Sequence, residues 1–199
     1  LSTFTVSGGG INGPEAITIP IGGTFTWTGG TLNANSVLNI QAGAIANASG
    51  AGTREALGII NNNGTWNMLG GNLGQPSFSS GPCTFNNLPG GSVNLNGWES
   101  TTNSWHQVTN NQGTFTKNNG AVTFTFSNDF SLKAFNNLAG GVLNAATGEC
   151  VFSVPTTNEG SMTGGGGSLI AVDGNSSGGF FSNEPGATVN TAFQLISGP

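Results

Sequence analysis

A short cassette recurs along this chain, and it constrains the fold more than any other feature of the sequence. It reads Gly, then Thr or Ser, then an aromatic residue or Met, then Thr or Asn, with a second Gly seven residues after the first and Leu or Val nine residues after it. Copies begin at Gly23, Gly64, Gly113 and Gly160. Self-similarity of this kind is the sequence signature of repeat architectures, in which neighbouring units bury one another's apolar side chains.

A second cassette, Phe-Asn-Asn-Leu-x-Gly-Gly-x-(Val or Leu)-Asn, alternates with the first. It is clearest at residues 85–94 and 135–144, with a worn copy at 181–190 and a weaker one at 40–46. When each cassette is anchored on the residue before its expected strand, the anchors fall at 23, 43, 64, 91, 113, 141, 160 and 187, one every 19 to 28 residues. Short strands separated by Gly and Asn at this spacing are typical of the coils of a parallel β-solenoid.

The side chain two residues after each anchor is apolar, and its neighbours are mostly small or polar. This alternation with a period of two predicts strands that bury one face. Coils stacked ~4.8 Å apart would turn the apolar positions into one continuous column. The predicted column contains Phe25, Ile45, Trp66, Val93, Phe115, Leu143, Met162 and Val189.

The spacing of the cassettes continues without a linker from residue 23 to residue 187. We therefore predict an all-β fold, a single-domain parallel β-helix (β-solenoid) of about eight coils over residues 1–199. Residues 1–19 are expected to form an N-terminal strand and turn, and residues 20–195 the repeat coils. Less than about a tenth of the residues should be helical, because no stretch keeps a 3.6-residue apolar period. The one place for a short helix is residues 53–58, as an inserted loop.

Pairs of asparagines precede several of the expected strands, at 61–62, 86–87, 110–111 and 136–137. Asn is depleted in strands, but it tolerates a left-handed backbone at sharp corners. Amides stacked from coil to coil can hydrogen-bond to one another in ladders. We interpret the pairs as stacked corner ladders, with ordinary surface turns as the alternative.

The composition excludes several classes of protein. With 3 Lys+Arg and 8 Asp+Glu, the chain cannot supply polar faces for several helices, so an all-α fold is excluded. Its 13 Phe and 4 Trp provide enough apolar surface for a folded core. Arg54, Lys117 and Lys133 stand singly, so we expect no nucleic-acid partner. No apolar run approaches the length of a membrane span, and we expect no membrane insertion.

The alternating Asn-Asn-x-Gly-Thr-aromatic and Phe-Asn-Asn-Leu-x-Gly-Gly cassettes resemble the repeats of large bacterial surface and secreted proteins with right-handed parallel β-helices, such as haemagglutinin-like adhesins and autotransporter passengers. The resemblance covers about residues 20–195. It implies a right-handed coil, an extracellular or cell-surface location and an elongated structural or adhesive role. The chain departs from long passengers in having only about eight coils. It begins at Leu1 without an apolar leader, so we expect that any signal peptide has been removed.

Three side chains form the strongest candidate binding site: Trp98, Trp105 and His106. A Trp ring offers a flat apolar face to a sugar ring. These residues therefore predict a carbohydrate-stacking patch, and the alternative is that the tryptophans pack back on the coil. We expect no metal site, because His106 is the only histidine and Cys83 and Cys150 lack C-x-x-C spacing.

Catalysis on a β-helix would require clustered carboxylates. Only Glu149, Glu159 and Asp173 come near such a cluster by phase, and the alternative is that they are solvated acids at corners. The strings at 8–13 and 174–178 match a dinucleotide-binding and a nucleophile motif in letters only, because no helix pattern follows either one. We predict that the chain is not an enzyme and carries no cofactor.

Two expectations concern covalent and non-covalent links. Cys83 and Cys150 should not be bonded to each other, because by phase they stand three coils apart, roughly 14 Å, whereas a disulfide needs Cα atoms within about 7 Å. The strand patterns at residues 1–6 and 192–196 contain no charge or Pro that would protect a free edge. We therefore expect end-to-end association with other copies, or continuation into neighbouring repeats of a longer chain.

Three functions follow as hypotheses. The leading one is an extracellular structural or adhesive β-solenoid module, part of a filament or of a longer surface protein. The second is a carbohydrate-binding or carbohydrate-active β-helix, with glycans as partners. The third is an ice-binding solenoid, suggested by the threonines at 24, 26 and 28, at 114 and 116, and at 123 and 125, although the intervening coils break the threonine pattern.

Overall fold

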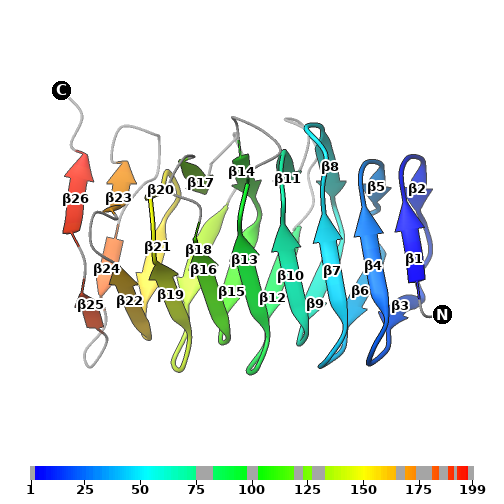
Figure 1. Cartoon of the computed structure of the whole chain (residues 1–199), viewed down its shortest axis with the longest axis horizontal. Helices are drawn as coiled ribbons and strands as arrows, with labels where there is room; N and C mark the ends of the chain where they lie inside the picture. The colour runs from blue at the N-terminus through cyan, green and yellow to red at the C-terminus, as the bar shows by residue number, and fades with distance from the viewer. Residues whose placement is uncertain are drawn as a thin grey trace.

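The computed structural model describes residues 3–74, 83–97, 103–118, 123–126, 133–164, 169–173, 181–183, 188–190 and 192–196. All of its regular elements are short strands, arranged in an elongated stack with the two termini at opposite ends (Figure 1). The described residues contain no helix, and so none long and apolar enough to cross a membrane.

Every third strand along the chain joins the same sheet, and all strand pairs are parallel. Three sheets of nine, nine and eight strands result, called here sheets A, B and C. Sheet A contains β1 (Thr3–Val6), β4 (Thr24–Trp27), β7 (Ile45–Ala48), β10 (Thr65–Met68), β13 (Ser92–Leu95), β16 (Thr114–Lys117), β19 (Val142–Ala145), β22 (Ser161–Gly164) and β25 (Thr188–Asn190).

Sheet B forms the second side of each coil. It contains β2 (Gly10–Ile11), β5 (Thr31–Leu32), β8 (Thr53–Ala56), β11 (Asn72–Gly74), β14 (Asn103–His106), β17 (Phe124–Phe126), β20 (Glu149–Phe152), β23 (Leu169–Asp173) and β26 (Ala192–Ile196). Sheet C closes the coil. It contains β3 (Ala16–Ile19), β6 (Val37–Ile40), β9 (Ile59–Asn62), β12 (Thr84–Asn87), β15 (Val108–Asn111), β18 (Ala134–Asn137), β21 (Thr156–Asn158) and β24 (Phe181–Asn183).

The predicted all-β parallel β-helix is therefore confirmed, with two differences in detail. The described strands make eight coils of three strands and a ninth of two, one more coil than expected, because residues 3–19 form a complete coil (β1 to β3) rather than a strand and a turn. Residues 53–58 hold strand β8 instead of the short helix that the sequence allowed.

The predicted apolar column is confirmed for Phe25, Trp66, Val93, Phe115, Leu143 and Met162, whereas the side chain of Val189 lies outside the described part of the chain. The register of sheet A aligns Phe25, Ala46, Trp66 and Val93, and all four side chains are buried. Ile45, which the sequence placed in the column, points outward and is 42% exposed. The prediction for this coil was wrong by one residue, because Gly43 is a turn glycine with φ +78° and Ala44 occupies the anchor position.

The anchor glycines are required by close approach between coils. A Cβ atom at Gly91 would lie 2.5 Å from the carbonyl oxygen of Asn62 and 2.6 Å from Oδ1 of Asn87. In the Gly-Gly pairs that begin the strands of sheet A, at 22–23, 90–91 and 140–141, the first glycine turns the chain with a positive φ, as Gly90 does at +88°. The second glycine, such as Gly91, then lets the next strand start against the preceding coil.

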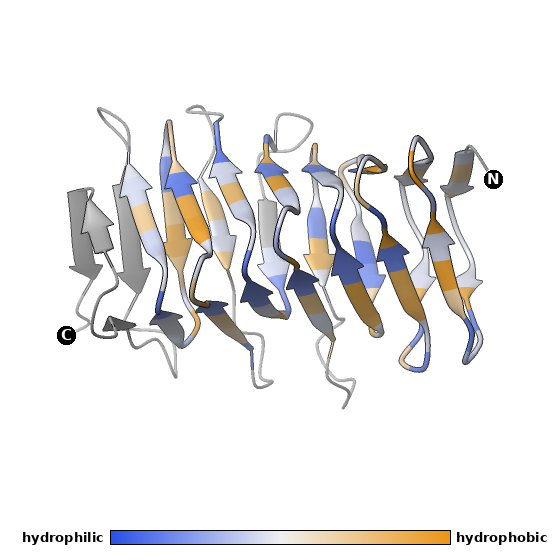
Figure 2. Ribbon diagram, turned by 90° about the horizontal axis from the view of Figure 1, so that it is seen from below, coloured by the Kyte–Doolittle hydropathy of each residue, from blue (hydrophilic) through white to orange (hydrophobic). Residues whose placement is uncertain are grey.

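Aromatic side chains connect the core along its length. From Phe4 in the first coil to Phe152 in the seventh, ring contacts form a continuous series at centroid distances from 4.6 to 6.5 Å, in which Trp27 of the second coil contacts Trp66 of the fourth directly. Figure 2 shows the same alternation as the sequence, with hydrophobic and hydrophilic residues alternating along the strands. The core of the stack is thus one continuous apolar column.

The asparagine pairs form ladders, as predicted, but at strand ends rather than at corners. The first Asn of each pair faces outward on sheet C, and its Nδ2 donates to the Asn of the preceding coil, as in Asn110 Nδ2 to Asn86 Oδ1 at 2.9 Å. The second Asn is buried, and its Nδ2 donates to the following coil, as in Asn111 Nδ2 to Asn137 Oδ1 at 2.7 Å. Two ladders of opposite polarity therefore run along the two faces of one sheet.

Candidate functional site

The structure overturns part of the predicted carbohydrate-stacking patch. Trp105 is fully buried, its ring contacts Phe85 at 4.8 Å, and its Nε1 donates to Thr109 Oγ1 at 2.8 Å. Its indole therefore cannot stack on a sugar. His106 is half-buried beside it, over Gly74, and Trp98 lies outside the described residues. The alternative considered from the sequence, that the tryptophans pack back on the coil, is the one that Trp105 follows.

The three acidic residues that came near each other by phase do not share a column. Glu149 begins β20 on sheet B, whereas Glu159 follows β21 on sheet C. Asp173 ends β23, and the register pairs Leu169, at the other end of β23, with Glu149. The outward Glu149 accepts a hydrogen bond from Thr123 Oγ1 at 2.9 Å. Among the residues that the structure describes, no three His, Cys, Asp or Glu side chains are grouped so that they could hold a metal ion.

All three cationic side chains of the chain are buried, which sequence reasoning missed. Arg54 lies inside the corner between sheets A and B, where its guanidinium donates to the carbonyl oxygens of Ser49, Gly50 and Gly70. These turn carbonyls face the interior, and the guanidinium satisfies several of them at once. Arg54 is therefore a structural cation.

Lys117 has no such partners. It occupies the inward position that Met68 and Leu95 hold in the two preceding coils, and its Nζ has no hydrogen-bond partner among the described residues. Burial lowers the pKa of Lys117 from 10.5, and the nearby Cys150 opposes this. Burial also raises the pKa of the Cys150 thiol to about 12. The cassette could have revealed this lysine, because its position is apolar in the neighbouring coils.

A second buried lysine lies in the corner between sheets B and C. Lys133 is 4% exposed, and its Nζ donates to Sγ of the buried Cys83 at 3.3 Å. Gln107, on the coil between them, is 2% exposed. Neither Nε2 nor Oε1 of Gln107 has a hydrogen-bond partner among the described residues. Cys83 and Cys150 are not bonded to each other, as expected.

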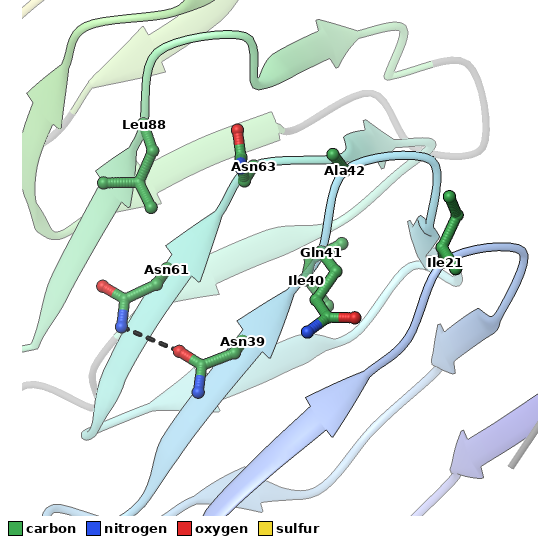
Figure 3. Close-up of a pocket in the computed structure, with 8 residues that line it drawn as sticks. All are labelled: Ile21, Asn39, Ile40, Gln41, Ala42, Asn61, Asn63 and Leu88. Atoms are coloured by element: carbon green, nitrogen blue, oxygen red, sulfur yellow. Dashed lines mark hydrogen bonds between the residues drawn. The ribbon is translucent and has the colours of Figure 1, made fainter.

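A groove opens on the described surface where the first four coils turn from sheet C toward sheet A (Figure 3). It has a volume of about 480 Å³. Ile21, which is 77% exposed, and Leu88 supply apolar side chains, and Asn39, Gln41 and Asn61 supply amides. Asn61 Nδ2 donates to Asn39 Oδ1 at 2.9 Å. None of the lining residues is ionisable, so the groove suits a neutral ligand.

The threonines that suggested ice binding are divided between two sheets: those at 24, 26, 114 and 116 lie on the outward face of sheet A, whereas Thr125 lies on β17 of sheet B. In register, Thr24 and Thr26 are followed by Ile45 and Asn47 in the next coil. Farther along, Thr114 and Thr116 are followed by Val142 and Asn144. The two outward rows are therefore mixtures of Thr, Ser, Asn and aliphatic residues, and ice binding stays an untested hypothesis.

Comparison with known proteins adds no relative to this picture. No protein-family model matches the chain, and neither the search of curated proteins nor the search of solved structures returned a match.

Proposed function

We propose that this chain is a structural module of an extracellular protein, a rigid β-solenoid rod that lengthens when its first coil stacks on a coil of a second copy. One observation carries the proposal. The outer face of the coil β1 to β3 leaves the apolar column uncovered, and among the described residues no strand pairs with the outer edges of these three strands.

The exposure of the core changes at this end. Phe4 is only half-buried, although its ring stacks on Phe25 at 5.9 Å with an interplanar angle of 16°. Ile17 is half-buried too, whereas Leu38, its register partner in the next coil, is fully buried. A further coil would therefore bury the same column that every interior coil buries.

The backbone supports the same direction of growth. The edges of β1, β2 and β3 present unpaired N–H and C=O groups, which can pair with another parallel strand. A last coil placed on a first coil makes a heterologous contact, and such a contact produces a filament when it does not close into a ring. The rod-like stack in Figure 1 suits this mode of assembly.

Sedimentation velocity over a wide range of protein concentration tests the proposal. We expect concentration-dependent association, lost when Phe4→Lys and Ile17→Lys place charges on the uncovered column. Ile59→Lys is the matched control, because Ile59 is 37% exposed and lies on β9 in the third coil, away from the stacking face. A monomer at every concentration, or equal association by all variants, would contradict the proposal.

An adhesive role through neutral glycans is the second candidate, and the groove of Figure 3 favours it. Amides that donate and accept, next to aliphatic side chains, match the alternating hydroxyl and C–H surfaces of a sugar. Glycan-array binding should be weakened by Gln41→Ala and kept by Asn94→Ala, which changes an amide on sheet A outside the groove. If both variants bind glycans equally well, the groove is not the site.

A further inference from the structure

A polar row interrupts the apolar interior in the corner between sheets B and C. One inward position precedes each strand of sheet C, and the register places these positions one above the other. In three consecutive coils this position holds a thiol, a carboxamide and an amine. From the third coil to the seventh the row reads Gly58, Cys83, Gln107, Lys133 and Val154.

The register and one direct contact bring these three side chains into the same corner. The Lys133 side chain extends past the coil of Gln107, since its Nζ donates to Sγ of Cys83, two coils away, at 3.3 Å. Sγ of Cys83 donates to the carbonyl oxygen of His106, the residue before Gln107, at 3.3 Å. Adjacent coils are ~4.8 Å apart. The side chain of Gln107 therefore leaves the backbone on the coil between those of Cys83 and Lys133.

The buried carboxamide of Gln107 destabilises the fold as long as it has no hydrogen-bond partner. Both polar atoms of the Gln107 carboxamide lack a hydrogen-bond partner among the described residues. A buried polar group without a hydrogen-bond partner loses its hydration without compensation, so it destabilises the fold. A reaction that consumes the carboxamide of Gln107 would relieve this penalty.

We propose that Cys83 joins Gln107 to Lys133 through an intramolecular isopeptide bond. First, Sγ of Cys83 attacks the carboxamide carbon of Gln107. The C–S bond forms, the C–N bond breaks, and the thiol proton leaves with the nitrogen as ammonia. Next, Nζ of Lys133 attacks the thioester carbon. The new C–N bond forms, the C–S bond breaks, and Sγ takes a proton and becomes a thiol again.

The atoms and charges balance without an oxidant or a co-reactant. The carboxamide of Gln107 and the ammonium of Lys133 give one secondary amide and one ammonium ion, and Cys83 is regenerated. Holding the groups side by side replaces a bimolecular reaction by an intramolecular one, which raises the effective concentration by orders of magnitude. Exclusion of water from the corner protects the thioester from hydrolysis.

Two opposing influences act on the pKa of the Cys83 thiol. Burial raises the pKa of Cys83, and the charge and hydrogen bond of Lys133 oppose this rise. Lys133 is thus placed both to assist ionisation of the thiol and to accept the acyl group afterwards. Lys117, the other buried lysine, is flanked in register by Leu95 and Ala145 and has no carboxamide on either side in its row. It provides a matched control.

Mass spectrometry of the purified chain tests the proposal. We expect the intact denatured chain to be lighter than its sequence by one ammonia, about 17 Da, and the loss to withstand hydroxylamine, which cleaves thioesters. Proteolysis should release a branched peptide that contains both Gln107 and Lys133. Cys83→Ala, Gln107→Met and Lys133→Met should each restore the full mass, whereas Lys117→Met and Cys150→Ala should keep the loss.

Three outcomes would overturn the proposal: a folded unsubstituted chain with its full sequence mass, a loss that hydroxylamine reverses, and a loss that maps to one of the Asn-Gly sequences. The first shows that no bond forms. The second shows a thioester that Lys133 does not attack, and the third an unrelated cyclisation. The branched peptide is sought in the unsubstituted chain, so the result stands even where a variant fails to fold.

Discussion

Trp27 and Trp66 come from the second and fourth coils, yet their rings meet edge to face, with centroids 6.5 Å apart and an interplanar angle of 84°. The coil between them contributes Ala46 and Ala48 to the core, in register with Trp66 and Trp27. The two indoles extend over these small side chains and fill the volume of the third coil. A T-shaped aromatic pair of this kind adds to the burial energy of each ring.

This contact predicts the effect of enlarging Ala46. Ala46→Leu should destabilise the fold by about 1–3 kcal/mol, because the space above Ala46 already holds two indoles. Ile45→Leu, one residue earlier and facing outward, should change stability by less than about 0.5 kcal/mol. Urea unfolding of the two variants compares them directly. The opposite order would restore the register in which Ile45 belongs to the column.

Trp66 should be among the most costly side chains to remove. It is fully buried and contacts the rings of Trp27 and Phe85. Trp66→Ala should therefore cost about 3–5 kcal/mol, as for other large-to-small changes in a core. Chemical denaturation measures this, and a loss below about 1 kcal/mol would place Trp66 outside the core.

The sequence predicted the fold class because a period of two and a repeat of fixed offsets both follow from the stacking of coils. In each copy of the cassette, the residue two positions after the anchor points into the core, whichever apolar residue it is. The predicted register of the third coil was wrong because Gly43 was taken as the anchor. The Gly-Gly pairs of other coils show that the residue after the turn glycine is the anchor, which is Ala44 here.

The patch of Trp105 and the buried row of Cys83, Gln107 and Lys133 were harder to predict, because these residues lie outside the cassettes. Trp105 belongs to sheet B, whose strands share no consensus, so its face could not be read from a repeat. The polar row of Cys83, Gln107 and Lys133 becomes visible only when the register is known. Coil lengths that vary from 19 to 28 residues hide such rows in the sequence.

The two ladders on sheet C should differ in their contribution to stability. Asn111→Ala removes a buried amide and leaves Asn87 Nδ2 and Asn137 Oδ1 without their ladder partner. We expect a loss of about 2–4 kcal/mol, since each buried group left unpaired costs roughly 1–3 kcal/mol. Asn110→Ala is the matched control on the outer ladder, where water can replace the lost partner. Equal losses in thermal unfolding would contradict this.

Thr109 owes its place in the core to Trp105. The corresponding inward position holds Phe85 in the preceding coil and Phe135 in the next one, whereas Thr109 accepts the hydrogen bond of the indole N–H. Thr109→Val keeps the shape and removes the acceptor, so it should cost about 1–3 kcal/mol. In the Trp105→Phe background the same change should cost less. A double-mutant cycle that shows no coupling between the two sites would rule out this hydrogen bond.

The buried Lys117 should make stability depend on pH in a predictable direction. Its pKa is lowered in the folded chain and stands near 10.5 in the unfolded chain, so the unfolded state binds more protons over the interval between the two values. The contribution of Lys117 to stability should therefore rise with pH across that interval, and the full penalty applies below it. Lys117→Met removes the buried amine and inserts the side chain that Met68 provides in the same row, so it should stabilise the fold by about 1–3 kcal/mol at pH 7. This advantage should shrink as the pH approaches 10.5. Both chains keep Cys83 and Cys150, so the thiols differ between them only through the interaction of Cys150 with Lys117. Arg54→Met, by contrast, should destabilise the fold at every pH because it removes the hydrogen bonds to the turn carbonyls.

Urea titrations at a series of pH values measure the stability of all three chains. An advantage of Lys117→Met that stays constant with pH would show that the Lys117 amine titrates normally in the folded state.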